Sequence, residues 1–295
     1  MKKARKSPFR LDKVAIMFIA PAFIFYTLFI IVPTVSSVYY SFTSWDGISP
    51  EKLYVGMENY KKLFTDKHFL DALWFTVKFT VLTVITQNLG ALLIASLLDS
   101  VKRFQGFLRG VFFIPNVLSG VIVAFIWGFI FTKVLPAIGE GTGLSFLNVS
   151  WFSQSQTAFW STIIVSFWLG TGYLTVVYLA GLSTVDTNVI ESAKLDGVNP
   201  VQMLFRIKVP LIWPSIIVGL FLITMNGLKQ FEIVFLMTGG GPYRSTETLA
   251  LLSYNTAYQK NNFGQATAQA IILFALVAVV TSIQLAVLKR KEVEG

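Results

Sequence analysis

Residues 191–210 read ESAKLDGVNPVQMLFRIKVP, and this polar stretch decides the fold because it interrupts an otherwise hydrophobic chain. The whole chain is 54% hydrophobic and only 13% charged, which is typical of a membrane protein. A membrane protein seldom places two helix signals in a long polar loop unless something docks there. The segment 182–209 is therefore interpreted as a docking element.

The first half of this segment carries helix-starting signals. Ser183 and Thr184 are residue types that begin helices, and Ser183 with Asp186 fits a loose capping box. Small apolar residues follow at four-residue intervals and form a stripe along one helix face. The stripe consists of Val185, Val189 and Ala193. These signals predict a helix over residues 184–196.

The second half carries a stop and a restart. Gly197 stands where a helix ends, because glycine accepts a positive φ without steric cost. Asn199 is a good cap, and Pro200 fits the first turn of the next helix. We expect a second helix over 200–208, which makes the segment a helix-turn-helix elbow. An ordinary connecting loop is the alternative, and the agreement of cap, break and restart speaks against it.

The same spacing resembles the EAA loop of binding-protein-dependent ABC importer permeases, whose pattern is Glu-Ala-Ala-x3-Gly-x9-Ile-x-Leu-Pro. The two departures are Ser192 in place of alanine and Val209 in place of leucine, and both are conservative. The resemblance implies that the elbow couples the membrane helices to a partner ATPase. The coupling residues it implies are Glu191, Ser192, Ala193, Gly197, Ile207 and Pro210.

A second stretch of sequence, further downstream, resembles the carbohydrate-uptake branch of these permeases, the maltose and glycerol-phosphate group. It covers the run Leu236-Met-Thr-Gly239-Gly-Gly-Pro242, then Ser245-Thr-Glu-Thr-Leu249, Tyr258, Phe263-Gly264 and Ala266. Together the two motifs extend the resemblance over nearly all 295 residues.

Six stretches contain the roughly 20 apolar residues that a bilayer crossing requires. They are 14–40, 74–98, 108–131, 158–181, 210–230 and 266–288. The first is longer than the hydrophobic region of a signal peptide, so we expect an uncleaved span. The predicted fold is all-α, a polytopic membrane protein with six transmembrane helices and an EAA-type coupling helix-turn-helix, the type I importer permease fold.

The distribution of basic residues predicts the orientation. More Lys and Arg fall in the N-terminus, the elbow and the C-terminus than in the loops on the other side, which indicates that these segments are cytoplasmic. The expected organisation is a basic N-terminus (1–13), a first span with an extracytoplasmic loop (14–73), a five-span core (74–288) and a cytoplasmic C-terminus (289–295). The expected location is a bacterial or archaeal plasma membrane.

The sequence contains no pattern for catalysis. It has no P-loop, no His-Glu-x2-His and no Gly-x-Ser-x-Gly motif, and it has no cysteine and a single histidine, His68. We therefore expect no catalytic residue, no metal site and no cofactor on this chain. The net charge of +9 does not indicate nucleic-acid binding, because the basic residues gather at membrane edges.

Polar residues inside spans are costly in lipid and usually face the protein interior or a cavity. For Gln87 and Asn88 we favour hydrogen bonds between helices, and Lys229 and Glu232 could pair on one helix face. For a further set of residues, lining a sugar pathway and forming hydrogen bonds between helices are equally supported interpretations. The set is Ser119, Gly170, Tyr173, Asn226, Lys229 and Gln230. The resemblance implies a central sugar cavity at these positions, although Gly227 stands where the maltose permease has asparagine.

The resemblance implies a permease subunit that imports a sugar, expected to be an oligosaccharide, by alternating access. The implied partners are a second permease, two copies of an ABC ATPase that bind ATP and Mg²⁺, an extracytoplasmic solute-binding protein and the lipid bilayer. A glycerol-3-phosphate or polyol importer is the runner-up. A non-transporting membrane receptor or scaffold for an ATPase is the alternative from another class. A secondary transporter would need carboxylates deep in the membrane, which the spans do not offer.

Overall fold

The computed structural model describes residues 13–101 and 103–293, and within these ranges the chain is helical with no named strand. Five helices are long and apolar enough to cross a membrane, and a bent pair makes a sixth crossing if it counts as one span. The fold class predicted from the sequence is therefore confirmed. Residues 1–12, which hold most of the basic N-terminus, and Lys102 lie outside the described residues.

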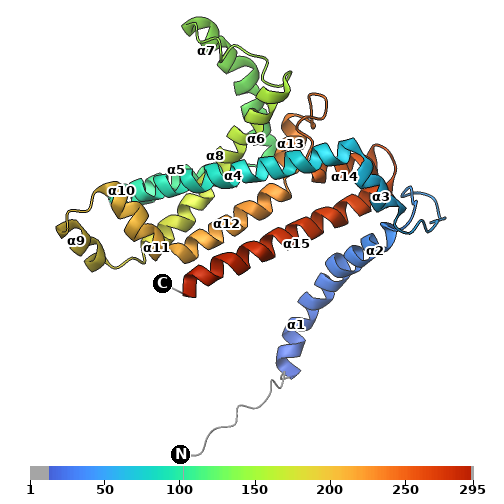
Figure 1. Cartoon of the computed structure of the whole chain (residues 1–295), viewed down its shortest axis with the longest axis horizontal. Helices are drawn as coiled ribbons and strands as arrows, with labels where there is room; N and C mark the ends of the chain where they lie inside the picture. Colours follow the sequence, from blue (N-terminus) through green and yellow to red (C-terminus); the bar gives the residue numbers. More distant parts are fainter. Residues whose placement is uncertain (1–12, 102, 294–295) are drawn as a thin grey trace, which may run out of the picture.

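The helices follow one another with short connections (Figure 1). In chain order they are α1 (Lys13–Tyr26), η1 (Thr27–Ile31), α2 (Val32–Tyr40), α3 (Glu58–Thr65), α4 (Lys67–Ser100), α5 (Gln105–Phe113), η2 (Ile114–Val117), α6 (Gly120–Phe129), η3 (Ile130–Val134), α7 (Leu135–Thr142), α8 (Ser155–Leu182), α9 (Thr187–Leu195), α10 (Pro200–Gln202), η4 (Met203–Lys208), α11 (Val209–Leu211), α12 (Trp213–Leu228), α13 (Glu232–Met237), α14 (Leu249–Tyr258) and α15 (Phe263–Val293).

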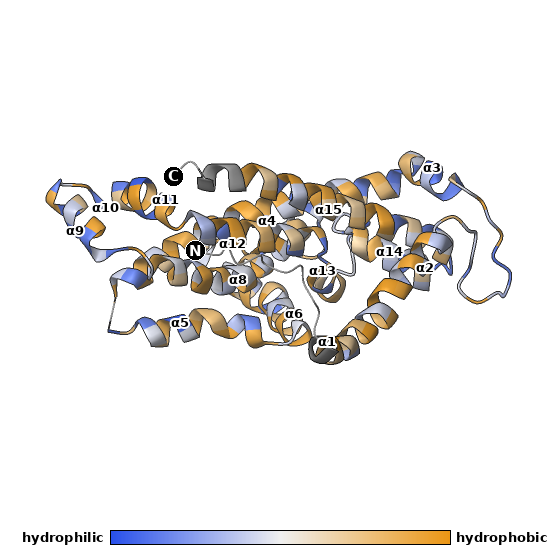
Figure 2. Cartoon of the chain, turned by 90° about the horizontal axis from the view of Figure 1, so that it is seen from below, coloured by the Kyte–Doolittle hydropathy of each residue, from blue (hydrophilic) through white to orange (hydrophobic). Residues whose placement is uncertain are grey.

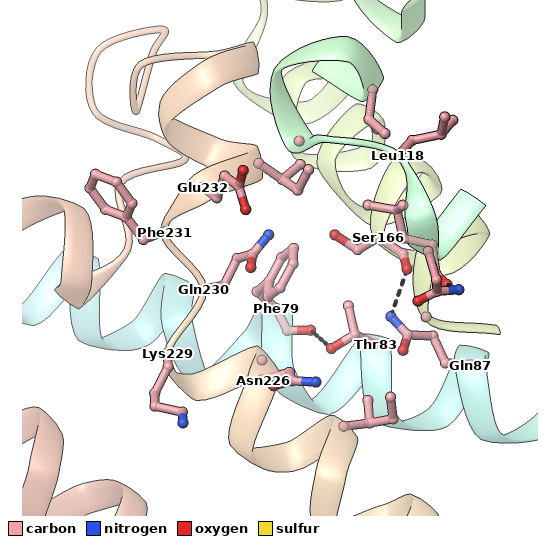
Figure 3. Close-up of a pocket in the computed structure, with 18 residues that line it drawn as sticks. Phe79, Thr83, Gln87, Leu118, Ser166, Asn226, Lys229, Gln230, Phe231 and Glu232 are labelled. Carbon is pink, nitrogen blue, oxygen red and sulfur yellow. Dashed lines mark hydrogen bonds between the residues drawn. The ribbon is translucent and has the colours of Figure 1, made fainter. Parts of the chain in front are cut away.

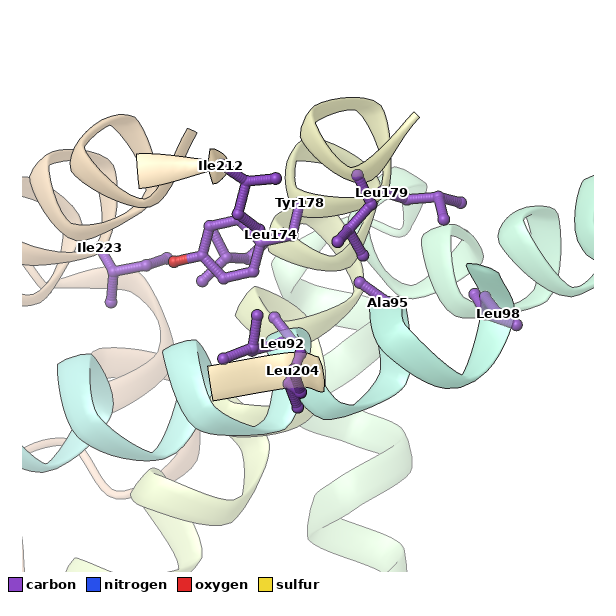
Figure 4. Close-up of a cluster of buried hydrophobic side chains, with 11 residues drawn as sticks. Leu92, Ala95, Leu98, Leu174, Tyr178, Leu179, Leu204, Ile212 and Ile223 are labelled. Atoms are coloured by element: carbon purple, nitrogen blue, oxygen red, sulfur yellow. The ribbon is translucent and has the colours of Figure 1, made fainter. Parts of the chain in front are cut away.

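The centre of the bundle is the pair α4 and α8, with α12 packed against both and α15 packed against α12. Figure 4 shows the apolar cluster at one end of this bundle, where Leu92, Leu174 and Tyr178 meet. Gly172 of α8 allows α5 to approach closely, because a Cβ at this position would lie 1.9 Å from the carbonyl oxygen of Phe112 on α5. The core is therefore a helix-on-helix contact in which small residues let backbones touch.

Two amide side chains of α4 join it to α8. The Nε2 of Gln87 donates to the carbonyl oxygen of Ser166 at 2.9 Å, and the hydroxyl of Tyr178 donates to Oδ1 of Asn88. Gln87 is buried and Asn88 is partly buried in the bundle, where a polar group needs a protein partner. The prediction that Gln87 and Asn88 form hydrogen bonds between helices is confirmed.

The third apolar stretch does not form one helix over 108–131, so that expectation is wrong. The chain runs through α5 and η2, turns extended at Leu118 and Ser119, and restarts as α6 at Gly120. Pro115 explains the change, because its ring removes a backbone donor and clashes with the preceding turn. Helicity then continues to Thr142, and α6 and α7 point away from α4, α12 and α15 (Figure 1).

The elbow lies at one end of the bundle, which we call the elbow end. Its first helix is capped by Asp186, whose carboxylate accepts from the backbone N–H of Asn188, so the expected Ser183–Asp186 capping box is wrong. The Ser183 hydroxyl donates instead to the carbonyl oxygen of Leu179, which ends α8. The first elbow helix therefore begins at Thr187, three residues later than the predicted start at 184.

The restart of the elbow is as predicted. Gly197 has a φ of +76°, and Asn199 forms a capping box with Gln202 at the start of α10. The chain then passes through the π-helical η4 and bends by 82° into α12. The elbow and the fifth span are thus joined directly, through one sharp bend.

The opposite end carries the loops and short helices that flank the spans. Hydrogen bonds from the Ser49 hydroxyl and from the backbone N–H groups of Ile48 and Ser49 lower the pKa of Asp46 to about 2. The buried Asn59 of α3 donates to two carbonyl oxygens of the first loop. Figure 2 shows hydrophilic residues gathered near the two ends and hydrophobic residues along the spans between them.

The first span stands apart from the rest of the described bundle. No side chain of Ile16–Tyr40 is buried, although α2 touches α15. Large apolar residues also cover α6, where Phe125 is 77% exposed. Both surfaces are suited to lipid or to another membrane subunit.

Candidate substrate cavity and coupling surface

A cavity of about 460 Å³ opens among α4, α6, α8, α12 and α13 (Figure 3). Two interruptions of helical structure meet at it, one at Leu118–Ser119 before α6 and the other at Lys229–Phe231 between α12 and α13. Irregular backbone at membrane depth is tolerated where it is covered by protein or lines a cavity. The breaks and the cavity therefore belong together.

The wall formed by α4 and α8 carries hydroxyl and amide groups. The hydroxyl group of Thr83 donates to the carbonyl oxygen of Phe79, and the Gln87 amide donates to the carbonyl oxygen of Ser166 on α8. Gly170 makes room for that amide, since a Cβ there would lie 1.9 Å from Gln87 Oε1. The Ser166 hydroxyl is buried here without a hydrogen-bond partner in the described part of the chain. An unpartnered buried hydroxyl is a group that a ligand or water can satisfy.

The opposite wall comes from the end of α12 and the start of α13. In Figure 3 the side chains of Asn226 and Gln230 are directed into the cavity, and Lys229 is directed away from its centre. Lys229 and Glu232 form no ion pair in the described structure, because Lys229 lies in the non-helical break after α12 and Glu232 begins α13. The pairing suggested by their three-residue spacing is therefore wrong.

The sequence-predicted pathway residues fall into two groups. Gly170, Asn226, Lys229 and Gln230 line the cavity together. Ser119 lies between two lining residues without lining the cavity itself, and Tyr173, which is 39% exposed, also stands outside it.

Several lining residues were not identified from the sequence. They are Phe79, Thr83, Asn116, Ser166, Phe231 and Glu232. Asn116 follows Pro115 directly, and its side chain donates to the carbonyl oxygen of Leu169 at 2.8 Å. A polar residue beside a proline within an apolar stretch was the available signal, since such prolines mark interrupted helices.

The elbow presents most of its predicted coupling residues to the outside. Glu191, Ser192, Gly197 and Pro210 are exposed, whereas Ala193 is buried and Ile207 is partly buried. The small Ala193 therefore packs the elbow, while the exposed residues are available to a partner.

Exposed apolar residues extend this coupling surface. Leu195 is 89% exposed and Val201 is 66% exposed, and neither was singled out in the sequence. Exposed apolar residues near a charge are typical of a surface on which a soluble partner docks. In the described part of the chain, no cluster of His, Cys, Asp and Glu gathers closely enough to hold a metal ion.

Comparison with known proteins finds a matching family and similar relatives. The model of the binding-protein-dependent transport system inner membrane component matches residues 87–293. The probable starch degradation products permease AmyD of Thermoanaerobacterium thermosulfurigenes is 34% identical, with 94% of each chain covered. The multiple sugar-binding transport permease MsmF of Streptococcus mutans is also 34% identical, with 94% of this chain and 95% of MsmF covered.

A solved structure agrees with the fold. A chain of a bacterial ABC transporter that imports the acidic polysaccharide alginate superposes with a TM-score of 0.84 at 22% identity, covering 95% of this chain and 96% of that one.

Proposed function

This chain belongs to the family of binding-protein-dependent transport system inner membrane components, and we propose that it imports an oligosaccharide across the plasma membrane. One observation carries the proposal: a cavity lined by amide and hydroxyl groups lies where two broken helices meet. Substrate sites of membrane transporters are commonly built from discontinuous helices near the middle of the bilayer.

The chemistry of the cavity fits a sugar. The amides of Asn226 and Gln230 can both donate and accept hydrogen bonds, which suits hydroxyl groups. Phe79 and Phe231 supply apolar ring surface beside them. The names of AmyD and MsmF, which refer to starch degradation products and to multiple sugars, support the same substrate class.

ATP hydrolysis is assigned to a separate ATPase, present in two copies, which binds ATP and Mg²⁺. The exposed Glu191 and Leu195 of the elbow are proposed to dock on it. A second permease is proposed to cover the exposed apolar faces of α1 and α6 and to complete the pathway. A solute-binding protein is proposed to deliver the sugar at the opposite end.

The bent connection between elbow and α12 supports alternating access. A helix transmits displacement along its length, and α12 begins beside the elbow and ends at Leu228, directly before the cavity-lining Lys229. A movement that the ATPase imposes on the elbow is therefore felt by Asn226 and Gln230. ATP and the loaded binding protein must both favour the outward-facing state for import to be driven.

The proposed orientation has the elbow and both termini in the cytoplasm, as the distribution of basic residues favours. Single cysteines introduced into this cysteine-free chain at Gly197 and Asp46 test it with a membrane-impermeant thiol reagent. We expect labelling of position 46 from outside and of position 197 only after the membrane is opened. Labelling of position 197 in intact cells would overturn the orientation.

Reconstitution tests the function as a whole. Vesicles that contain this chain, its partner permease, the ATPase and the binding protein should take up a labelled maltooligosaccharide only when ATP is supplied. The purified chain alone should bind no nucleotide, because it lacks a P-loop. Absence of uptake by the complete complex, or stoichiometric nucleotide binding by this chain alone, would contradict the assignment.

A further inference from the structure

The carboxylate of Glu232 lies against the first turn of α6. A Cβ on Gly120, the first residue of that helix, would lie 2.1 Å from Glu232 Oε1 and 2.4 Å from Cδ. Those distances are far shorter than any real contact, so the carboxylate sits in space that only glycine leaves free. Gly120 and Glu232 are 112 positions apart, yet α6 and α13 pack together and bring them into contact.

The start of α6 is otherwise uncapped. Its N-cap residue, Ser119, is extended and makes no side-chain hydrogen bond to the helix. The first N–H groups of a helix have no partner within the helix, and the helix dipole makes this end attractive to negative charge. The exposed carboxylate of Glu232 therefore lies beside the helix end that favours an anion, at this edge of the cavity.

The charge of Glu232 is not neutralised by a cation in the described structure. Among the described residues that line the cavity, the ionisable ones are Lys229 and Glu232. They form no ion pair, and Figure 3 shows the Lys229 side chain directed away from the carboxylate. The described lining thus holds one carboxylate, four amide side chains and two hydroxyl groups, besides the ammonium group of Lys229.

We infer that Glu232 is a charge filter, which makes the cavity accept uncharged saccharides and reject those that carry a carboxylate or a phosphate. This inference rests on the proposed function and narrows its substrate class. In many transporters the N-terminus of a broken helix at the cavity attracts the anionic group of the substrate. Here the protein's own carboxylate lies beside that helix end, where it repels a second anion and can accept hydrogen bonds from hydroxyl groups.

A pair of thiol reagents of opposite charge tests the filter without any substrate. Leu118 lines the cavity, and in this cysteine-free chain Leu118→Cys provides a single reactive group. The probes are the cationic trimethylammonium-ethyl and the anionic sulfonato-ethyl methanethiosulfonates. They are applied to the assembled complex with cysteine-free partner subunits, and their rates are normalised to those with free 2-mercaptoethanol.

With Glu232 present, the cationic probe should react about three- to tenfold faster than the anionic one, as expected for one charge at close range in a partly solvated site. Glu232→Gln keeps the size of the side chain and should bring the ratio close to 1. Gly120→Ala should lower the ratio as well, because the added methyl group displaces the carboxylate. Glu140→Gln in α7 removes an exposed carboxylate that does not line the cavity and should leave the ratio unchanged.

A ratio that is the same with Glu232 and with Glu232→Gln would overturn the filter. A purely structural role of Glu232 would change both rates in parallel and leave their ratio constant, which equally overturns it.

Protection of the same cysteine from the uncharged N-ethylmaleimide tests the substrate class. Maltotriose should protect Cys at position 118 in both backgrounds, and trigalacturonate should protect it only in Glu232→Gln. Equal protection by trigalacturonate with Glu232 present would contradict the filter. Glu232→Gln could bring the ratio of cationic to anionic reaction rates to 1 while maltotriose gives no protection. That result would support the filter and contradict the proposed sugar permease.

Discussion

Lys208 of the elbow and Asp99 at the end of α4 form an ion pair, with Nζ of Lys208 2.6 Å from Oδ2 of Asp99. The two side chains are only 13% and 23% exposed, so water screens this pair far less than a surface pair. It joins η4 to the second span across 109 positions of sequence. The elbow is therefore fastened to α4 as well as to α12, and these two helices both line the cavity.

Breaking this ion pair is predicted to loosen the elbow. Asp99→Asn or Lys208→Met should lower the stability of the complex by about 1–3 kcal/mol, because each leaves a half-buried polar partner behind. The double variant should be less destabilised than the sum of the two single variants. Thermal unfolding of the purified complex measures stability, and sugar uptake per ATP hydrolysed measures coupling.

The matched control is the pair Glu58–Lys62, whose side chains are 53% and 62% exposed. Lys62→Met should change neither quantity, since exposed pairs contribute little. Full additivity of Asp99→Asn and Lys208→Met would show that the pair does not fasten the elbow.

Gly197 is predicted to matter through its backbone and not through packing. Its φ is +76°, and nothing lies within 4 Å of a Cβ at that position. Gly197→Asn should retain coupling, because asparagine tolerates the left-handed region, whereas Gly197→Val should cost about 1–2 kcal/mol locally and impair uptake. Uptake in vesicles and co-purification of the ATPase report the effect. Equal activity of the valine and asparagine variants would rule out a conformational requirement.

Gly172 is predicted to matter through packing. Gly172→Ala should destabilise the bundle by about 1–3 kcal/mol, because the new methyl group meets the backbone of Phe112 and α5 must move away. Gly110→Ala on α5 is the control, since a Cβ there meets nothing within 4 Å of this chain. The midpoint of thermal aggregation of the two variants in detergent separates them. An unchanged midpoint for Gly172→Ala would contradict the close contact of α5 and α8.

The elbow and most spans were predictable because their signals are local. Gly197, Asn199 and Pro200 specify a helix stop and restart within four residues, and the structure places both as expected. The break before α6 was missed because apolar composition continues across it, and only Pro115 marks the interruption. Hydropathy reports membrane depth and not helix continuity.

The residues that line the cavity were only partly predictable from the sequence, for a similar reason. Lys229 and Glu232 share a face only if one helix contains both, and the break at Gln230–Phe231 rotates Glu232 toward α6. Tyr173 is three positions from Gly170 on α8, yet only Gly170 lines the cavity. Which face of a helix meets the cavity depends on tertiary packing, which a single sequence does not display.

Asn226 is predicted to contact the transported sugar. Asn226→Ala should lower uptake several-fold, since a lost polar contact is worth about 1 kcal/mol, and should leave the ATPase activity stimulated by the binding protein near its normal rate. Tyr173→Ala is the comparison, because Tyr173 is on a neighbouring helix but does not line the cavity, and it should lower uptake less. Initial rates of uptake and of ATP hydrolysis are measured in the same vesicles. If Asn226→Ala transports as fast as the unaltered complex, or if hydrolysis falls in proportion to uptake, Asn226 holds helices together and does not bind the sugar.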